Sequence, residues 1–545
     1  MTRTAVLNSL IVLFALMTLA CAAPSPTAQP TGAAEQPKPG GTLRLAIDVD
    51  PGGLDIEKVT DNAAHQVLIP VHAQVLRTIP NDWNHIEGDL ATKWEASADG
   101  LTWNFTLRPD AQWHDGRPVT VDDVVYSLNR QISPPQGFKG GSAGCMKELG
   151  AAPARTDDAH FTVKLNTPAV AFLQCLAFSY VRIGPRHINE PIDKNEGSRE
   201  LKPSEIVGAG PFKFRSYDRG SSWVVERHPA YHFKDRPYLD GMTFFVIPDL
   251  NTRLASLRAG QLHLPRSSEQ LKPSQAQQIQ ADMGDKVVMH KAIEARLVGL
   301  FFNLESGPFK DIRLRRAVNL AIDRQAMIEF LQEGSGTITP PLCTCWDYIH
   351  DEAYYMTRPG FRADKTQDLK EAKRLVDEVT GGKGIDVVFT TPLLLDYPTQ
   401  TELERTQLAQ VGIRVEVQLL ENAIAQQRWK EGQFQAVGAF PAGVPFQDPD
   451  SMMTRYFLPK SERNWPRWQN KEFLDLFAKE TVMLDQAERA KLLRRMADIL
   501  EEDLPVVGLT DAQRIVPFSR SVRGFEKDPP SSTADYRWDW VWLQD

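Results

Sequence analysis

The sequence predicts an α/β protein with an additional α+β part, folded as more than one domain. Its 545 residues exceed what a single hydrophobic core accommodates, so at least two cores are expected. In the C-terminal half, long helical patterns alternate with short β-type runs, which is the order of elements in an α/β domain. The N-terminal half has shorter strand patterns with more glycine and proline, which indicates a mixed α+β arrangement.

The first 20 residues are typical of an export signal. Arg3 supplies a short basic start, and residues 10–16 form an apolar run that is too short to span a bilayer. Small Ala20 precedes Cys21, which predicts cleavage at this point and lipid attachment to Cys21. Cleavage one or two residues further on is the alternative, and it would release a soluble protein.

Residues 21–40 predict a flexible tether. They are rich in proline, alanine and polar side chains and too poor in large apolar groups to fold. A coil of about 20 residues has an average reach of about 25 Å, which is enough to hold a folded domain away from a bilayer. No other membrane span is expected along the chain.

Residues 102–130 predict a strand, a tight turn and a capped helix. Apolar and polar residues alternate over residues 102–107, the period of a half-buried strand. Gly116 follows an aspartate, which is a turn signal. Thr120 and Asp123 have the spacing of a capping box at the start of the helix.

Helical and strand patterns then alternate in the C-terminal half. Helical spacing of apolar residues covers 315–331, 368–379 and 486–501, and β-type runs cover 385–389 and 413–419. These elements are the basis for the predicted α/β domain.

The net charge of −8 argues against nucleic acid, or an anionic membrane surface, as the main partner.

Five cysteines are present, and assigning Cys21 to lipid leaves Cys145, Cys175, Cys343 and Cys345, which permit three pairings. Pairing the first two of these four would close a loop of about 30 residues and stabilise the fold by about 3 kcal/mol. Pairing the last two would close a very small ring. No metal or cofactor site is expected, because the spacing brings no histidines or carboxylates to these cysteines.

Several motifs that resemble catalytic or nucleotide sites are better explained as structure. Pro211 follows the glycines of residues 208–210 and prevents a phosphate-binding turn into a helix. Residues 141–144 lack the spacing of a nucleophile elbow. His228 and His232 are four residues apart, but a proline lies between them, so a surface turn is expected instead of a helical metal site.

Residues 90–130 resemble the most recognisable block of the family 5 extracellular solute-binding proteins, the receptors of peptide, nickel and oligosaccharide ABC importers. The resemblance covers the chain from about residue 40 to its C-terminus. Further blocks occur in the family's order, at residues 40–43, 51–55, 208–249, 257–264, 302–323 and 448–450.

This resemblance implies a two-lobed periplasmic binding protein type II fold, with an extra subdomain on the first lobe and a hinged cleft between the lobes. Two chain crossings between the lobes would permit hinge closure. The implied boundaries are residues 41–77, 205–295 and 500–545 for lobe I, 78–204 for the extra subdomain, and 296–499 for lobe II.

The resemblance also implies where charged ligand groups would be held. Dipeptide and oligopeptide receptors bind the ligand's amino group with an aspartate just before the segment that matches Asp448-Pro449-Asp450, and the aligned residue here is Pro445. Dipeptide receptors hold the carboxylate with an arginine in a loop that corresponds to residues 390–397, which contain none. Since an unpaired buried charge costs several kcal/mol, a zwitterionic dipeptide is disfavoured. Alternatively the alignment is shifted, and Asp448 or Asp396 is the anchor.

The candidate ligand-lining residues follow from the same resemblance. They are Gly52, Gly53 and Leu54 of lobe I, and Trp346, Leu394, Leu395, Phe440, Pro445, Phe446 and Asp448 of lobe II.

Together these observations predict a receptor, not an enzyme. It would be anchored by lipid at the outer face of the cytoplasmic membrane, in the periplasm or at the cell surface, as a monomer. It would capture a peptide-like or other small organic solute and deliver it to ABC permease subunits. A receptor for a metal or metallophore, and a ligand-sensing lipoprotein that signals to a membrane partner, are the alternatives. A secreted hydrolase is disfavoured, because the sequence contains no convincing nucleophile or metal set.

Overall fold

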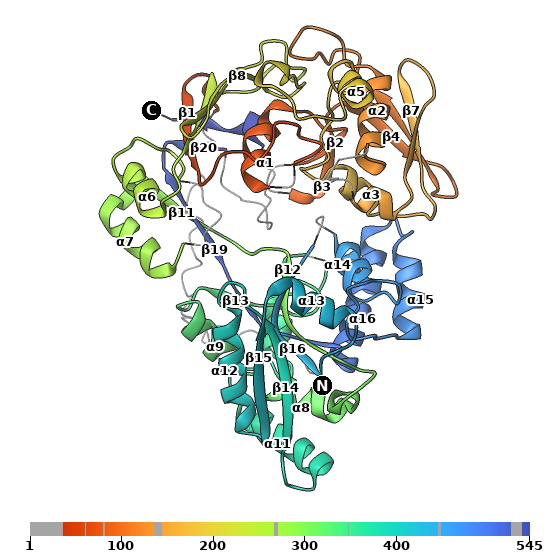
Figure 1. Ribbon diagram of the computed structural model, residues 1–545, viewed down its shortest axis with the longest axis vertical. Helices are drawn as coiled ribbons and strands as arrows, with labels where there is room; N and C mark the ends of the chain where they lie inside the picture. The colour runs from red at the N-terminus through yellow and green to blue at the C-terminus, as the bar shows by residue number, and fades with distance from the viewer. Residues whose placement is uncertain are drawn as a thin grey trace, which may run out of the picture. The chain divides into compact units, whose positions relative to one another are not determined.

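In the computed structural model (Figure 1), residues 38–545 form one compact unit, separate from residues 1–37. The export signal, most of the tether and Cys21 lie outside the described residues. Within the part that is described, no helix is both long and apolar enough to cross a bilayer. The structure describes residues 36–59, 61–79, 82–135, 144–265, 271–346, 348–444, 448–524 and 537–544.

In the described part of residues 38–545, the strands form three sheets and four two-stranded pairs. The first sheet has the order β1-β10-β9-β8, with β1 parallel to β10 and the other pairs antiparallel. Apolar side chains alternate along β1, where Leu43, Leu45 and Ile47 are buried in one core. The strands of this sheet are β1 (Thr42–Ile47), β8 (Phe212–Asp218), β9 (Ser222–Arg227) and β10 (Gly241–Val246).

The second sheet is antiparallel and contains the predicted strand-turn-helix segment. The predicted strand is β5, Gly116 adopts a φ of +88° in the turn, and Thr120 and Asp123 form the capping box of α2. Cys145 and Cys175 form a disulfide within the core that this sheet shares with α2. In the order of the sheet the strands are β4 (Ala91–Ala96), β5 (Thr102–Leu107), β7 (His160–Lys164) and β6 (Ala152–Arg155).

The third sheet has five strands and a core on each face. Along β12, Leu297 and Phe301 belong to one core, whereas Leu300 and Phe302 belong to the other. β14 is parallel to both β15 and β16, as expected for the predicted α/β part. In the order of the sheet the strands are β15 (Ile413–Leu420), β14 (Ile385–Pro392), β16 (Ala436–Gly443), β12 (Arg296–Phe302) and β17 (Val506–Gly508).

The remaining strands form two-stranded pairs. They are β2 (Leu76–Ile79) with β3 (Asp82–Gly88), β11 (Val287–Ala292) with β19 (Arg514–Ser519), β13 (Gly336–Ile338) with β18 (Thr510–Ala512), and β20 (Val522–Arg523) with β21 (Trp542–Leu543).

Helices flank the sheets, and α12 packs against β14, β15 and β16 (Figure 1). The α-helices of the described residues are α1 (Asn62–Leu68), α2 (Val121–Ile132), α3 (Gly144–Glu148), α4 (Phe172–Leu176), α5 (Arg186–Asn195), α6 (Leu250–Arg258), α7 (Pro273–Met283), α8 (Ile312–Ala321), α9 (Arg324–Leu331), α10 (Glu352–Met356), α11 (Thr366–Thr380), α12 (Tyr397–Ala409), α13 (Asn422–Lys430), α14 (Pro449–Tyr456), α15 (Lys471–Glu480) and α16 (Gln486–Asp503). Single 3-10 turns occupy Ile69–Val71, Pro203–Glu205, Gly284–Lys286, Pro308–Lys310 and Trp538–Trp540.

Of the three helices predicted in the C-terminal half, two are confirmed and one is divided. The patterns at 368–379 and 486–501 correspond to α11 and α16. The pattern at 315–331 contains α8 and α9 instead of one helix, because Ile322 is extended and Asp323 starts a new helix. The Asp323 side chain accepts a hydrogen bond from the backbone N–H of Ala326, which is the geometry of an N-cap.

The prediction of a surface turn at His228 and His232 is wrong in one respect. The segment does turn, but both imidazoles are buried. His232 Nε2 lies 2.7 Å from a carboxylate oxygen of Asp89, and the His228 ring packs edge-on against His114. Burial lowers the pKa of His228 to about 4, so this ring is neutral at pH 7.

The chain passes between the first and third sheets twice. Residues 293–295 connect β11 to β12, and Gln513 connects β18 to β19. β17 pairs with β12 in the third sheet, and β18 pairs with β13. The expected limit of the second lobe, residue 500, precedes both strands.

Candidate binding site

The carboxyl ends of β14, β15 and β16 form one edge of the five-stranded sheet. Parallel pairing sets Pro392 of β14 opposite Leu420 of β15, so both strands end at the same level. In α/β sheets, ligands bind beyond the carboxyl ends of the parallel strands, where the connecting loops diverge. This edge is the candidate binding edge of the third sheet.

Four apolar side chains are exposed at the binding edge. Leu393 and Leu395 follow β14, Leu419 lies near the end of β15, and Ile424 lies in the first turn of α13; each exposes between 47% and 74% of its surface. They are half of the eight large apolar side chains that are exposed in the described part of the chain. A cluster of exposed apolar residues is typical of a surface that contacts a ligand or partner.

The loop after β14 is held against β15, because the backbone N–H of Leu393 donates to the carbonyl of Leu420 at 2.7 Å. Leu394 is half-buried and packs on the core of the sheet. Leu395 is exposed and has a φ of +51°, a left-handed conformation that is rare for a bulky residue and costs conformational energy. Asp396 follows and is also exposed. The two predicted leucines therefore differ: Leu395 is exposed, whereas Leu394 is half-buried.

The carboxylate of Asp448 is bound within the protein. Only 3% of the residue is exposed, and its two oxygens accept hydrogen bonds from Arg489 at 2.7 and 2.8 Å. Arg489 also binds Asp450 at 2.8 Å and Glu480 at 2.9 Å. Burial, and the charge of Asp448, raise the pKa of Asp450 well above its usual range. The Arg489 guanidinium thus binds three carboxylates. Both carboxylate oxygens of Asp448 are already hydrogen-bonded to it and are not available to a ligand.

Trp346 and Phe440 lie in the core beside the binding edge. The Phe440 ring packs edge-on against Trp465 and Trp429, with ring centroids 4.9 and 5.2 Å apart. Trp346 is buried in the same core, and its indole N–H has no hydrogen-bond partner among the described residues. Both predicted lining residues are therefore packed inside the protein in this structure.

On the first sheet, Gly52, Gly53 and Leu54 belong to the loop between β1 and α1. A Cβ added at Gly52 would lie 2.8 Å from the Asp61 carboxylate, and one added at Gly53 would lie 3.0 Å from Val59. These close approaches explain both glycines by packing within the loop. Leu54 is half-buried against the core of the first sheet.

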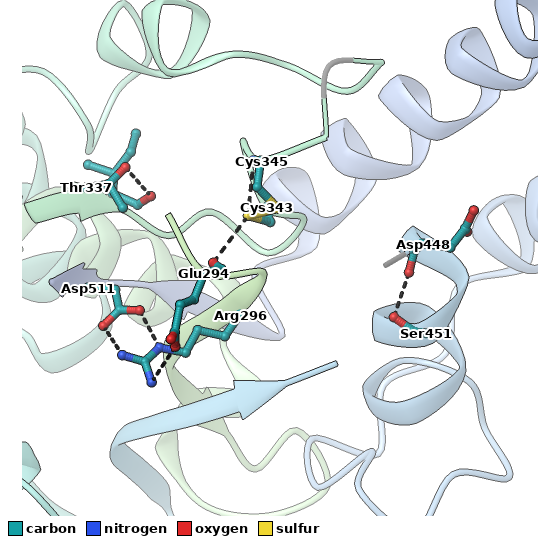
Figure 2. Close-up of a disulfide and its surroundings, with 9 residues drawn as sticks. Glu294, Arg296, Thr337, Cys343, Cys345, Asp448, Ser451 and Asp511 are labelled. Carbon is teal, nitrogen blue, oxygen red and sulfur yellow. Dashed lines mark hydrogen bonds and ion pairs between the residues drawn. A yellow bond between two sulfur atoms is a disulfide. The ribbon is translucent and has the colours of Figure 1, made fainter. Parts of the chain in front are cut away.

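The second disulfide lies beside the chain crossings (Figure 2). Cys343 and Cys345 are bonded, and Cys343 Sγ is 3.8 Å from the carbonyl oxygen of Glu294. Figure 2 also shows the Arg296 side chain between Glu294 and Asp511. The guanidinium lies 3.3 Å from the Glu294 carboxylate and forms two hydrogen bonds with Asp511. Because these carboxylates surround it, the pKa of Arg296 is raised and its charge is fixed.

Pro445 and Phe446 lie outside the described residues. Within the described ranges, no group of three or more histidine, cysteine, aspartate or glutamate side chains is placed to hold a metal ion. Leu419 and Ile424, which are exposed at the binding edge, are not among the candidate residues that the sequence predicts. One local feature of the sequence points to them. Each is a large apolar residue at the end of a strand or the start of a helix, where packing of the core does not require an apolar side chain.

Comparison with known proteins gives a consistent result. Residues 85–464, well over half of the chain, match the family described as "Bacterial extracellular solute-binding proteins, family 5 Middle". Heme-binding protein A of Haemophilus influenzae is 28% identical over 476 residues, which cover 83% of each chain. The dipeptide-binding protein of Escherichia coli is 25% identical over 519 residues, which cover 90% of this chain and 92% of that protein.

Solved structures share the fold. The structure of HbpA2 from Haemophilus parasuis superposes with a TM-score of 0.81 at 21% identity and covers 92% of this chain and all of its own. At that identity the likeness establishes the architecture and leaves the ligand open. The architecture is the two-lobed fold of periplasmic binding proteins, with mixed α/β content.

Proposed function

Because this chain belongs to the bacterial extracellular solute-binding proteins of family 5, whose members are binding proteins of transport systems, we propose that it is the receptor of an ABC importer for an apolar or weakly charged organic solute. The solute is peptide-like or another small organic molecule, and it is not a simple zwitterionic dipeptide. The protein carries out no catalysis on it.

The exposed apolar edge of the third sheet carries this proposal. A ligand-binding surface is concave and mostly apolar, with a few polar groups that fix orientation. Leu393, Leu395, Leu419 and Ile424 provide apolar surface at the carboxyl ends of the parallel strands. Burying one leucine side chain against a ligand contributes about 1.5–3 kcal/mol. These four side chains favour an apolar solute.

The distribution of charge supports the same conclusion. The loop of residues 390–397 contains no arginine to hold a carboxylate. Asp448 is already bound to Arg489, so using it for a ligand's amino group would require breaking a buried ion pair, at a cost of about 3–5 kcal/mol. Asp396 is the exposed carboxylate beside Leu395, and it would serve a solute that carries a single positive charge.

We place the lobes according to the cores and strand pairs. The first lobe comprises the β1-β10-β9-β8 sheet and the β11–β19 pair, with the β4-β5-β7-β6 sheet as its extra subdomain. The second lobe comprises residues 296–512. The two crossings, at residues 293–295 and at Gln513, are the proposed hinge, and rotation about them would close the lobes on the solute.

The remaining parts of the proposal concern location and partners. Cleavage before Cys21 and acylation of its thiol would tether the receptor at the outer face of the cytoplasmic membrane, as a monomer. The permease subunits of the importer would receive the solute from it. Relatives of similar identity are named for heme and for dipeptides, so sequence similarity alone does not select the cargo.

Native mass spectrometry of residues 22–545, purified without unfolding, tests the proposal. An uncharged or apolar adduct is the expected result, and a co-purified peptide with free termini would refute the assignment of the solute class. A matched ligand pair gives a second test on protein that carries no adduct. The N-acetylated, C-amidated form of dileucine should raise the melting temperature more than dileucine itself, because the site lacks partners for the two terminal charges. The opposite order would contradict the proposal.

A further inference from the structure

A groove of about 650 Å³ lies on the first lobe, away from the binding edge. It is bordered by the end of α6, the turn before β11, and the turn that joins β19 to β20. Its charged lining consists of four cations and a single carboxylate, and we call it the basic groove. These residues are Arg258, Lys286, Arg520, Arg523 and Asp285.

The cations are held by the backbone of the groove. The backbone N–H of Arg520 donates to the carbonyl of Lys286 at 2.9 Å, and the Arg520 side chain donates to the carbonyl of Asp285. Lys286 and Arg520 are exposed, whereas Arg258 is paired with Asp282 at 2.7 Å. Because both side chains are exposed, Lys286 and Arg520 carry their charges at the surface of the groove.

Neutral donors complete the lining. Ser519 and Ser521 lie at the groove with their hydroxyls 2.8 Å apart, so one hydroxyl donates to the other and the second keeps its O–H for a further acceptor. Burial and Arg44 lower the pKa of His263 to about 4, so this ring adds no charge at pH 7. The set of cations and hydroxyls is chemically suited to the oxygens of a phosphate group.

The groove lies beside the point where the tether enters the fold. A Cβ added at Gly41, just before β1, would lie 3.1 Å from the side chain of Leu543. Leu543 belongs to β21, which pairs with β20, and Arg523 of β20 lines the groove. Gln544 also lines the groove and donates its backbone N–H to the carbonyl of Ser521 at 2.8 Å. The face that would be drawn towards an anchored membrane is therefore the face that bears these cations.

We infer that the basic groove binds the phosphate headgroups of anionic lipids in the bilayer that carries the anchor. This inference rests on the proposed lipid anchor at Cys21. The net charge of −8 opposes adsorption of the protein as a whole, so the groove acts as a local contact that orients an already tethered receptor. The tether makes such a weak contact effective, because it keeps the groove and the bilayer at a high local concentration.

Vesicle sedimentation at low ionic strength tests the inference. Residues 22–545 contain every core of the described chain, and the probes are vesicles of phosphatidylglycerol and of phosphatidylcholine. Partitioning should favour phosphatidylglycerol and should decline as salt is added. Since each basic residue near an anionic surface contributes about fivefold to binding, the double variant Lys286→Gln, Arg520→Gln should partition about 25-fold more weakly.

The control variant is Lys373→Gln, Arg374→Gln on α11, which changes the net charge equally at an exposed site of the second lobe. It should sediment like the unmodified protein. Equal loss in both variants, or no preference for phosphatidylglycerol, would overturn the inference. So would a groove-dependent increase in melting temperature with inorganic phosphate when vesicles do not bind, because the ligand would then be a free phosphoryl compound.

The outcome is separable from the proposed function. Solute binding by the groove variant is measured by the same native mass spectrometry as for the unmodified protein. Acylation of Cys21 is measured from the mass of the N-terminal peptide of protein extracted from membranes. If the unmodified protein carries the solute and the lipid but shows no preference for phosphatidylglycerol vesicles, only the inference about the groove is rejected; loss of vesicle binding in the groove variant with retained solute binding supports it.

Discussion

Arg296 and Asp511 form a bidentate ion pair between β12 and β18, next to the two segments proposed as the hinge. Arg296 begins β12 and Asp511 lies in β18, with Nη2 and Oδ1 2.5 Å apart. Glu294, on the first crossing segment, lies 3.3 Å from the same guanidinium. The pair thus joins the proposed hinge segments to each other at their second-lobe ends.

Removing Asp511 should destabilise the protein strongly. In the Asp511→Ala variant, Arg296 would keep its charge in a largely buried position with only Glu294 beside it. Breaking a buried ion pair in this way costs about 3–5 kcal/mol of unfolding free energy. Urea denaturation measures this loss. The matched control is Asp386→Ala, which breaks the exposed pair with Arg414 and should cost less than about 1 kcal/mol. Equal effects of the two variants would contradict this account of the hinge.

Leu395→Asn should weaken solute binding without unfolding the protein. Leu395 is exposed, and asparagine tolerates its left-handed backbone while removing the apolar surface. The loss of one buried leucine contact should reduce affinity about tenfold or more, as measured by titration with the solute found by native mass spectrometry. Leu484→Asn changes an equally apolar, exposed residue elsewhere and serves as the control. An unchanged affinity in the Leu395→Asn variant would show that Leu395 does not contact the solute.

Glu404→Gln should stabilise the protein increasingly as the pH rises. Glu404 of α12 is fully buried, and neither carboxylate oxygen has a hydrogen-bond partner among the described residues. Burial raises the pKa of Glu404 well above its usual range. Above about pH 4.5 the folded state therefore holds a proton that the unfolded state has released, and stability falls by up to about 1.4 kcal/mol per pH unit until the folded group ionises.

The measurement is the unfolding free energy of both proteins from about pH 4.5 to about pH 8. Glutamine has the shape of the protonated acid and does not titrate. The difference in unfolding free energy between the variant and the unmodified protein should therefore grow, in favour of the variant, throughout this range. Glu402→Gln, an exposed position on the same helix, is the control. Two parallel curves for Glu404→Gln and the unmodified protein would show that Glu404 is not a buried neutral acid.

Loss of the Cys145–Cys175 disulfide should destabilise the extra subdomain. The bond closes a loop with a sequence separation of 30 residues inside a buried core. A double substitution by serine should lower the unfolding free energy by about 3 kcal/mol, chiefly because the unfolded chain gains conformational freedom. Differential scanning calorimetry compares it with the unmodified protein under oxidising conditions. A melting temperature unchanged by the double substitution would contradict this expectation.

Local sequence patterns predicted the local structure well. The alternating residues of β5, the capping box of α2 and the apolar spacing of α11 and α16 depend on neighbours a few residues away, and the structure confirms all four elements. The division of 315–331 into α8 and α9 depends on an equally local residue, Asp323, whose capping role the apolar spacing does not reveal.

The sequence by itself determined the family, the lobed fold and the α/β character of the chain, because these follow from long blocks and from short-range periodicity. Tertiary structure decided which of the predicted site residues are accessible. Phe440 and Trp346 are apolar and Asp448 is charged, yet all three are buried, because residues distant in sequence supply their surroundings. Asp448 meets Arg489 across 41 positions, and Arg296 meets Asp511 across 215. Such pairs, and the gathering of four apolar side chains at one sheet edge, arise only when the strands are placed side by side.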